Sequence, residues 1–154
     1  MKFALHFGNL AFPDGPGAKR LAQAAEKAGF ESILAIEHVV IPKEYDSKYP
    51  YSASGKLMGT AQINMPDPLA WMTYASAVTE TIKFMTGVLI LPQRNPLVLA
   101  KQLATMDYMS GGRIMLGVGV GWLEEEFDAL QIPFKTRGKY TDEDMQAMRA
   151  VWAG

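Results

Sequence analysis

Short apolar runs alternate with helix-like segments along the whole chain, and this alternation restricts the fold more than any other feature of the sequence. The runs begin near positions 3, 32, 84 and 114 of the 154 residues, so a run and the helix after it occupy about 30 residues. A long loop lengthens the second interval. We therefore predict strands at 3–7, 32–36, 83–91 and 113–120, separated by helices, as in parallel α/β proteins.

The helix-like segments carry start and stop signals of their own. Leu21, Ala24, Ala25 and Ala28 follow the i, i+3, i+4, i+7 pattern of a buried helix face, and Gly29 ends that helix. A second helix begins at the N-cap Asp67 and extends to about Thr79. Further helices are predicted at 97–109, at 123–130 and from a capping box formed by Thr141 and Asp144.

Four β/α units are compatible with two architectures. A TIM barrel contains eight such units and needs about 250 residues, so this chain would supply half of one. A four-stranded doubly wound sheet of the flavodoxin type has the same alternation of strands and helices. The spacing of the elements does not distinguish between them.

Residues 39–66 interrupt the periodic pattern with a polar loop that carries Tyr45, Tyr49 and Tyr51. Loops of this length inside a compact domain are functional lids or are disordered. We expect this one to be a lid over a substrate.

The composition excludes several classes of function. With no cysteine, the chain has no disulfide, no thiolate metal site and no thiol nucleophile. Fifteen Lys and Arg against 16 Asp and Glu leave a net charge of -1, so no nucleic-acid partner is expected. No apolar run is long enough for a membrane span and the N-terminus does not resemble a signal peptide, which favours a cytoplasmic protein. The acidic run Glu124, Glu125, Glu126 is interpreted as a solvated helix face.

The two histidines have different predicted roles. His38 directly follows the second predicted strand, at the end where α/β proteins build their sites, and imidazole can move a proton near neutral pH. Its neighbour Glu37 could orient it or bind a polar group of a substrate. The alternatives are a histidine bonded to the loop backbone and an exposed acid. His6 lies between Leu5 and Phe7 and is expected to be a packed core histidine.

Glycines interrupt the third and fourth predicted strands. Gly87 marks a bulge, a place where a ligand approaches the backbone, or close packing against a helix. Gly117, Gly119 and Gly121 alternate at the end of the fourth strand but lack the spacing of a dinucleotide-binding fingerprint. The sequence contains no phosphate-binding loop, no nucleophile elbow and no metal-spaced cluster, which weakens hydrolase and kinase hypotheses.

Together, several stretches resemble the bacterial luciferase-like flavin and deazaflavin oxidoreductases. They are residues 29–32 leading to 36–38, 86–92 followed by 94–96 and 101–102, and 107–122 (DYMSGGRIMLGVGVGW) with 125–127 and 137–138 after it. The resemblance covers essentially the whole chain in the right order. Residues 50–52 and 66–68 look like the subgroup that uses coenzyme F-420, an 8-hydroxy-5-deazaflavin hydride carrier.

The resemblance implies a TIM-barrel (β/α) parallel sheet that binds the cofactor ring at the C-terminal ends of its strands. The position of Gly87 and Val88 commonly has a non-prolyl cis peptide against the ring in this family. Leu89, the next residue, is also predicted to bind the cofactor. Gly119 and Val120 match positions near the cofactor on the fourth strand.

By the same resemblance, His38 lies beside the reactive carbon of the ring and Glu37 helps to orient it. The implied function is an oxidoreductase that transfers a hydride between a small organic substrate and coenzyme F-420. One alternative is an FMN-dependent monooxygenase that acts on paired donors with molecular oxygen. Another is a non-catalytic half barrel that binds cofactor or assembles with itself.

Two features depart from the family pattern. Trp122 stands where sugar-phosphate dehydrogenases of the family have an acidic glutamate, which favours a more apolar substrate. The chain ends where relatives continue for about another half barrel, so residues 1–154 are expected to be the N-terminal part of the domain, with the C-terminal half absent. Open sheet edges in a half barrel would favour pairing, for example as a homodimer.

Overall fold

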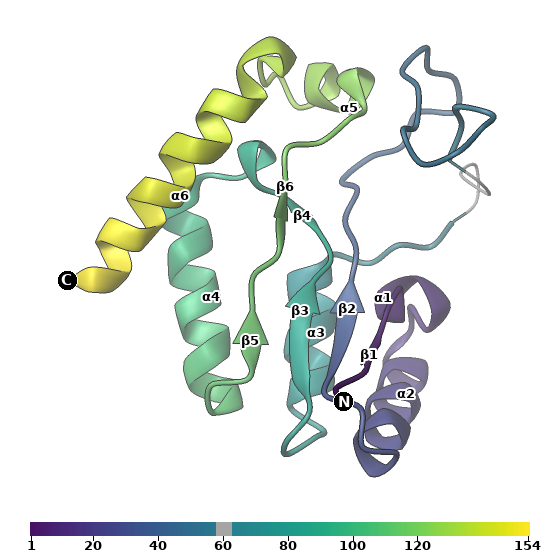
Figure 1. Cartoon of the computed structure of the whole chain (residues 1–154), viewed down its shortest axis with the longest axis vertical. Helices are drawn as coiled ribbons and strands as arrows, with labels where there is room; N and C mark the ends of the chain where they lie inside the picture. Colours follow the sequence, from purple (N-terminus) through teal and green to yellow (C-terminus); the bar gives the residue numbers. More distant parts are fainter. Residues whose placement is uncertain (58–62) are drawn as a thin grey trace. The chain divides into compact units, whose positions relative to one another are not determined.

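The computed structural model of the protein describes residues 1–57 and 63–154, which form two compact units (Figure 1). The first unit contains 1–37, 64–89 and 101–118, and the second contains 38–63, 90–100 and 119–154. None of the helices in the described ranges combines the length and apolar character needed to cross a membrane.

The first unit is built on a parallel sheet with the strand order β1-β2-β3-β5 (Figure 1). Its strands are β1 (Ala4–Leu5), β2 (Ser32–Ala35), β3 (Lys83–Thr86) and β5 (Ile114–Met115). The parallel α/β class predicted from the sequence is therefore confirmed. Each strand lies beside its predecessor in the chain, as in a barrel, whereas a flavodoxin-type sheet places its second strand outside the first.

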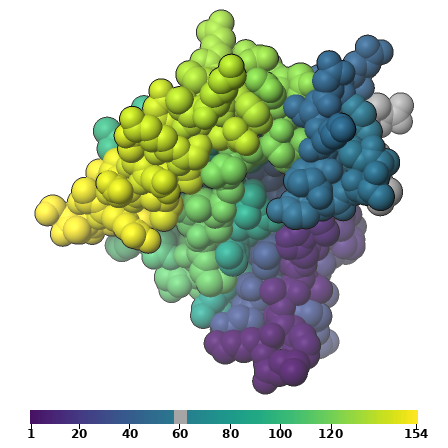
Figure 2. All heavy atoms as spheres, turned by 45° about the horizontal axis from the view of Figure 1, so that its top comes forward, coloured from purple at the N-terminus to yellow at the C-terminus, as the bar shows by residue number. Residues whose placement is uncertain are grey.

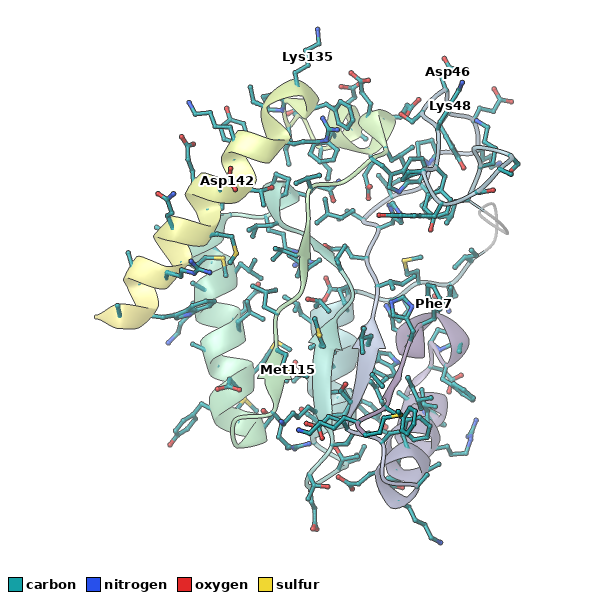
Figure 3. The ribbon with its side chains drawn as sticks, viewed as in Figure 1. Phe7, Asp46, Lys48, Met115, Lys135 and Asp142 are labelled. Atoms are coloured by element: carbon teal, nitrogen blue, oxygen red, sulfur yellow. The ribbon has the colours of Figure 1, made fainter. Side chains whose placement is uncertain are left out.

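The two faces of this sheet are buried to different degrees. Ile33 pairs with Phe84 and both are fully buried, because alternate side chains of β2 and β3 point toward the covering helices. The intervening residues are only half-buried: Leu34 pairs with Met85, and Met85 pairs with Met115, which is labelled in Figure 3. The apolar core of the first unit thus lies on one side of the sheet.

Two helices of the first unit begin at an aspartate N-cap, of which the sequence predicts Asp67. The Asp14 carboxylate accepts a hydrogen bond from Gly17 N (2.7 Å) at the start of α2 (Gly15–Lys27), and Asp67 accepts one from Ala70 N (2.9 Å) at the start of α3 (Pro68–Ser76). Gly29, with φ of 79°, follows the end of α2 as predicted. The one-turn helix α1 (Gly8–Ala11) was not predicted because four residues carry no periodic signal.

The third and fourth predicted strands are each divided in two. β3 is followed by a cis peptide bond between Gly87 and Val88, then by β4 (Leu89–Ile90) and a 3-10 turn at Leu91–Gln93. β5 is separated from β6 (Val118–Gly119), which pairs with β4.

A side chain bridges the two interruptions. The Thr86 hydroxyl donates to Gly117 O (2.7 Å) and accepts from Gly117 N (3.0 Å), so it replaces the backbone ladder there. A Cβ at position 117 would lie 2.3 Å from Thr86 O, which explains the glycine.

The second unit contains α5 (Glu124–Ala129), a 3-10 turn at Phe134–Thr136, α6 (Arg137–Ala153) and the first turn of α4 (Pro96–Ser110). Its buried side chains include Leu91, Leu99, Leu123, Phe127 and Met148. The described parts of the predicted loop, 39–57 and 63–66, have neither helix nor strand, in agreement with the sequence. The predicted start of the last helix is wrong: α6 begins at Arg137, and the Thr141 hydroxyl donates to Arg137 O (2.8 Å) inside the helix.

A buried arginine connects the ends of two helices in the first unit. Arg113 is 9% exposed, and its guanidinium donates to carbonyl or hydroxyl oxygens of four residues, at 2.7–3.1 Å: Ser76, Thr79, Ile82 and Ser110. Several of these oxygens belong to the ends of α3 and α4, where carbonyl groups lack helical partners. One cation therefore satisfies the polar groups of two helix termini.

We expect Arg113→Met to lower the free energy of unfolding by about 2–4 kcal/mol, because these buried oxygens lose the hydrogen bonds that the guanidinium donates. Arg20→Met, at an exposed position of α2, should change stability by less than about 0.5 kcal/mol. Chemical denaturation measures both values. Equal stability of the two variants would show that the buried guanidinium has no structural role.

Candidate functional site

The residues predicted to form the site are distributed over both units. Glu37, Gly87, Val88 and Leu89 belong to the first unit, and His38, Gly119 and Val120 belong to the second. Each group is described within its own unit.

In the first unit, the predicted cofactor-binding segment follows β3. The peptide bond between Gly87 and Val88 is cis, as the family resemblance led us to expect. A Cβ at position 87 would lie 2.8 Å from Leu34 Cδ2 and 3.2 Å from His6 Nε2, so a larger residue here would have to displace the Leu34 side chain. The Val88 side chain is 43% exposed, whereas Leu89 is fully buried. Val88 thus offers an apolar surface after the strand end, and Leu89 anchors the segment.

His6 is not the packed core residue that the sequence suggested. It is exposed, because β1 ends at Leu5 and the chain turns outward toward Phe7, which has a φ of 62° and is labelled in Figure 3. Nε2–H of His6 donates to Gly87 O (3.0 Å), and its ring makes an edge contact with the Phe7 ring at a centroid distance of 4.0 Å. His6 therefore fixes the carbonyl of Gly87.

In the second unit, His38 is held by a carboxylate from α5. His38 Nδ1 lies 2.9 Å from Glu126 Oε2, and the two side chains are 10% and 0% exposed. The other oxygen, Glu126 Oε1, accepts hydrogen bonds from Val39 N (2.6 Å) and Val40 N (3.2 Å). The imidazole is therefore held at one nitrogen by a buried acid.

Glu126 carries a negative charge despite its burial. Removal from water opposes ionisation, but hydrogen bonds and charge from His38, together with Val40 N–H, outweigh it and leave the pKa of Glu126 below its ordinary value. A buried charge is stable in proteins when it is paired and hydrogen-bonded in this way.

The prediction that the acidic run is a solvated helix face is wrong for two of its three residues. Only Glu124 is exposed; Glu125 is half-buried and Glu126 is fully buried. A signal was present in the sequence, because position 126 lies three residues after Leu123 and four before Leu130 and so falls on the apolar face of the predicted helix. An acid on such a face needs a buried partner.

Glu37 does not hold the imidazole. The carboxylate bonded to His38 belongs to Glu126, 88 residues further along the chain, so orientation of the ring falls to Glu126. Glu37 is 5% exposed, and it is therefore not the exposed strand-end acid of the alternative interpretation.

An aromatic cluster adjoins His38 in the second unit. The Trp122 ring meets the rings of His38, Tyr45 and Tyr49 at centroid distances of 5.7, 5.7 and 5.1 Å. Tyr45 is only 8% exposed, and its hydroxyl accepts from Leu57 N (3.0 Å). The loop thus contributes two aromatic rings to the cluster, and Trp122 connects them to the imidazole.

Glu125 attaches the same loop to α5. Its Oε1 accepts from Asp46 N (2.7 Å) and Ser47 N (3.1 Å), while the Ser47 hydroxyl accepts from Glu124 N (3.1 Å). Figure 2 shows the loop, in blue, directly against the green α5 segment, and the labelled side chain of Asp46 projects outward in Figure 3. Burial opposes ionisation of Glu125, but hydrogen bonds from Ser47 and from backbone N–H groups hold its pKa at about 2.

Gly119 and Val120 follow the pairing of β6 with β4. Gly119 is half-buried, and the Val120 side chain is 44% exposed. Gly121, with φ of 80°, then turns the chain so that Trp122 reaches the aromatic cluster.

Comparison with known proteins identifies the family. The model of the luciferase-like monooxygenases matches residues 8–154. The chain belongs to this family. It is 42% identical over 139 residues to the F420-dependent glucose-6-phosphate dehydrogenase of Nocardia farcinica, covering 87% of this chain and 37% of that protein. It is 31% identical over 137 residues to the FMNH(2)-dependent dimethylsulfone monooxygenase of Pseudomonas putida, covering 87% of this chain and 33% of that protein.

Solved structures agree with this assignment. A monooxygenase of Streptomyces bottropensis superposes with a TM-score of 0.76 at 28% identity, covering 100% of this chain and 44% of that one. The luciferase-like chain spans about half the length of the curated mycobacterial relatives it matches: it is 33% identical to them and covers 53% of their length. The family contains both F420-dependent and FMN-dependent relatives.

We expect Glu125→Gln to accelerate hydrogen exchange at the Asp46 and Ser47 amides, because a neutral amide oxygen accepts more weakly than a carboxylate. The folded pKa of about 2 lies below the ordinary 4.5, so the contribution of the carboxylate is complete above the unfolded value and is lost as the pH falls through about 2. Exchange in the wild type should therefore approach that of the variant over this interval. Exposed Glu124→Gln is the control, and equal protection in all three proteins would contradict the attachment.

Proposed function

We propose that this luciferase-like chain is the N-terminal part of an oxidoreductase that transfers a hydride between a small organic substrate and coenzyme F-420. The observation that carries the proposal is the His38 imidazole, positioned at the end of β2 by a buried carboxylate. Oxidation of an alcohol carbon releases a proton as well as a hydride, and an imidazole is suited to receive that proton. The 42% identity to an F420-dependent dehydrogenase favours the deazaflavin.

The residues after the strand ends fit a planar apolar ring. Val88 and Val120 expose apolar side chains in their respective units, and Gly87 and Gly119 place no side chain beside them. In this proposal Gly87 and Val88, anchored by the buried Leu89, contribute to the deazaflavin site, as do Gly119 and Val120. When bound, the deazaflavin supplies the hydride chemistry, while the protein orients the reactants and excludes water.

Trp122 favours a substrate less polar than a sugar phosphate. By the family resemblance it stands where the sugar-phosphate dehydrogenases have an acid, and its ring contacts those of His38, Tyr45 and Tyr49. Such an aromatic cluster suits an apolar alcohol or carbonyl compound. The loop that carries the two tyrosines would then act as the lid of the substrate site.

The second candidate is an FMN-dependent monooxygenase. It is favoured by the identity of 31% to an FMNH(2)-dependent monooxygenase and by the structural similarity to the Streptomyces bottropensis monooxygenase. The two functions share the fold and differ in the cofactor, so cofactor binding decides between them.

The extent of the match to relatives supports the proposed domain organisation. We propose that residues 1–154 supply the first four β/α units of a barrel, because the chain covers less than half of the structure it superposes on. A cytoplasmic location is part of the same proposal.

We expect the purified protein to quench the fluorescence of coenzyme F-420 on titration, and to do so at lower concentration than for FMN. His38→Ala should retain this binding within several-fold but lose turnover of an alcohol substrate by about 10²–10⁴-fold, because the proton acceptor is absent. Glu124→Gln, at an exposed position, is the control. Tight binding of FMN without binding of coenzyme F-420 would favour the monooxygenase instead.

A further inference from the structure

The two oxygens of Glu126 have different partners, and this difference fixes how the carboxylate acts on His38. Oε1 is occupied by two backbone donors, Val39 N and Val40 N, at 2.6 and 3.2 Å. Oε2 is left for His38 Nδ1 at 2.9 Å. Because backbone N–H groups can only donate, the group at the Oε1 position must be an acceptor.

The charge on Glu126 then determines which ring nitrogen of His38 carries a proton. An ionised carboxylate accepts hydrogen bonds and donates none, so Nδ1 must be the donor. This holds for the imidazolium and for one of the two neutral tautomers, but it excludes the tautomer protonated only at Nε2. Nε2 makes no hydrogen bond to any residue within 1–57 or 63–154.

We propose that Glu126 is a positioning residue that keeps a proton on Nδ1 of His38, so that Nε2 is the atom at which His38 exchanges protons. The tautomer follows from the hydrogen-bond geometry together with the ionised state of Glu126, and its importance for turnover rests on the proposed function. Glu126 touches no reacting atom in this scheme; it acts only through His38. The Trp122 ring, in edge contact with the imidazole, restricts rotation of the ring away from Glu126.

The isosteric variant Glu126→Gln separates this role from simple packing. The two backbone donors, Val39 N and Val40 N, require an oxygen at the Oε1 position, so the amide carbonyl should take that place. The amide NH₂ then faces His38 Nδ1, which must accept. The variant therefore retains the shape of the site but moves the ring proton to Nε2.

Nitrogen-15 NMR of the imidazole side chains measures the tautomer directly. The chain has two histidines, so His6→Asn leaves the signals of His38 alone and assigns them. We expect a protonated Nδ1 in the wild type and in Glu126→Asp, and a protonated Nε2 in Glu126→Gln. Glu125→Gln is the matched control, because Glu125 also accepts two backbone N–H groups but faces the loop. It should leave the His38 signals unchanged.

Turnover provides a second measurement on an active preparation. In hydrolases, the corresponding exchange of a carboxylate for an amide leaves the geometry intact and lowers kcat by about 10⁴-fold. We expect Glu126→Gln to lower kcat by about 10²–10⁴-fold with little change in KM, and Glu126→Asp to recover part of the loss.

The outcomes distinguish this inference from the proposed function. A wild-type ring protonated only at Nε2, or an Nδ1 proton that persists in Glu126→Gln, would overturn the role of Glu126. If Glu126→Gln fails to fold, the wild-type spectrum still decides, because a mixture of neutral tautomers is also incompatible with the proposal. If coenzyme F-420 does not bind while Nδ1 is protonated, the proposed function fails and the tautomer assignment stands.

Discussion

The second unit depends on one fully buried carboxylate that accepts three hydrogen bonds. Glu126 joins α5 to the residues directly after β2, and it does so through two backbone donors and the His38 ring. These donors compensate the buried negative charge, so the three hydrogen bonds and the charge stabilise one another. A single side chain from α5 therefore sets both the path of the loop and the position of the imidazole.

The sequence predicts the regular elements well because their signals are local. The N-cap Asp67 lies where the first turn of α3 requires an acceptor, and the parallel strands follow from their spacing along the chain. The same reasoning places His38 at a strand end. It does not predict the environment of His38, since the hydrogen-bond partner lies 88 residues away along the chain.

The errors arise where long-range contacts override local pattern. The acidic run has the composition of a solvated helix face, yet Glu126 also falls on the apolar face of the helix. Only the tertiary structure shows that Glu126 is buried with that apolar face. The third and fourth strands have continuous apolar runs, but the Thr86 hydroxyl bonded to Gly117 interrupts both at the same level. His6 has core neighbours in sequence and is nevertheless exposed.

The loop beside His38 is attached to α5 mainly through its peptide groups. Glu125 and Glu126 accept from the main chain of Asp46, Ser47, Val39 and Val40, and every residue except proline offers the same donor. Amino-acid replacements in this segment can therefore change the side chains that face a ligand, while the main-chain hydrogen bonds to Glu125 and Glu126 persist. Members of the family could thus diverge in what they accept without rebuilding the scaffold underneath.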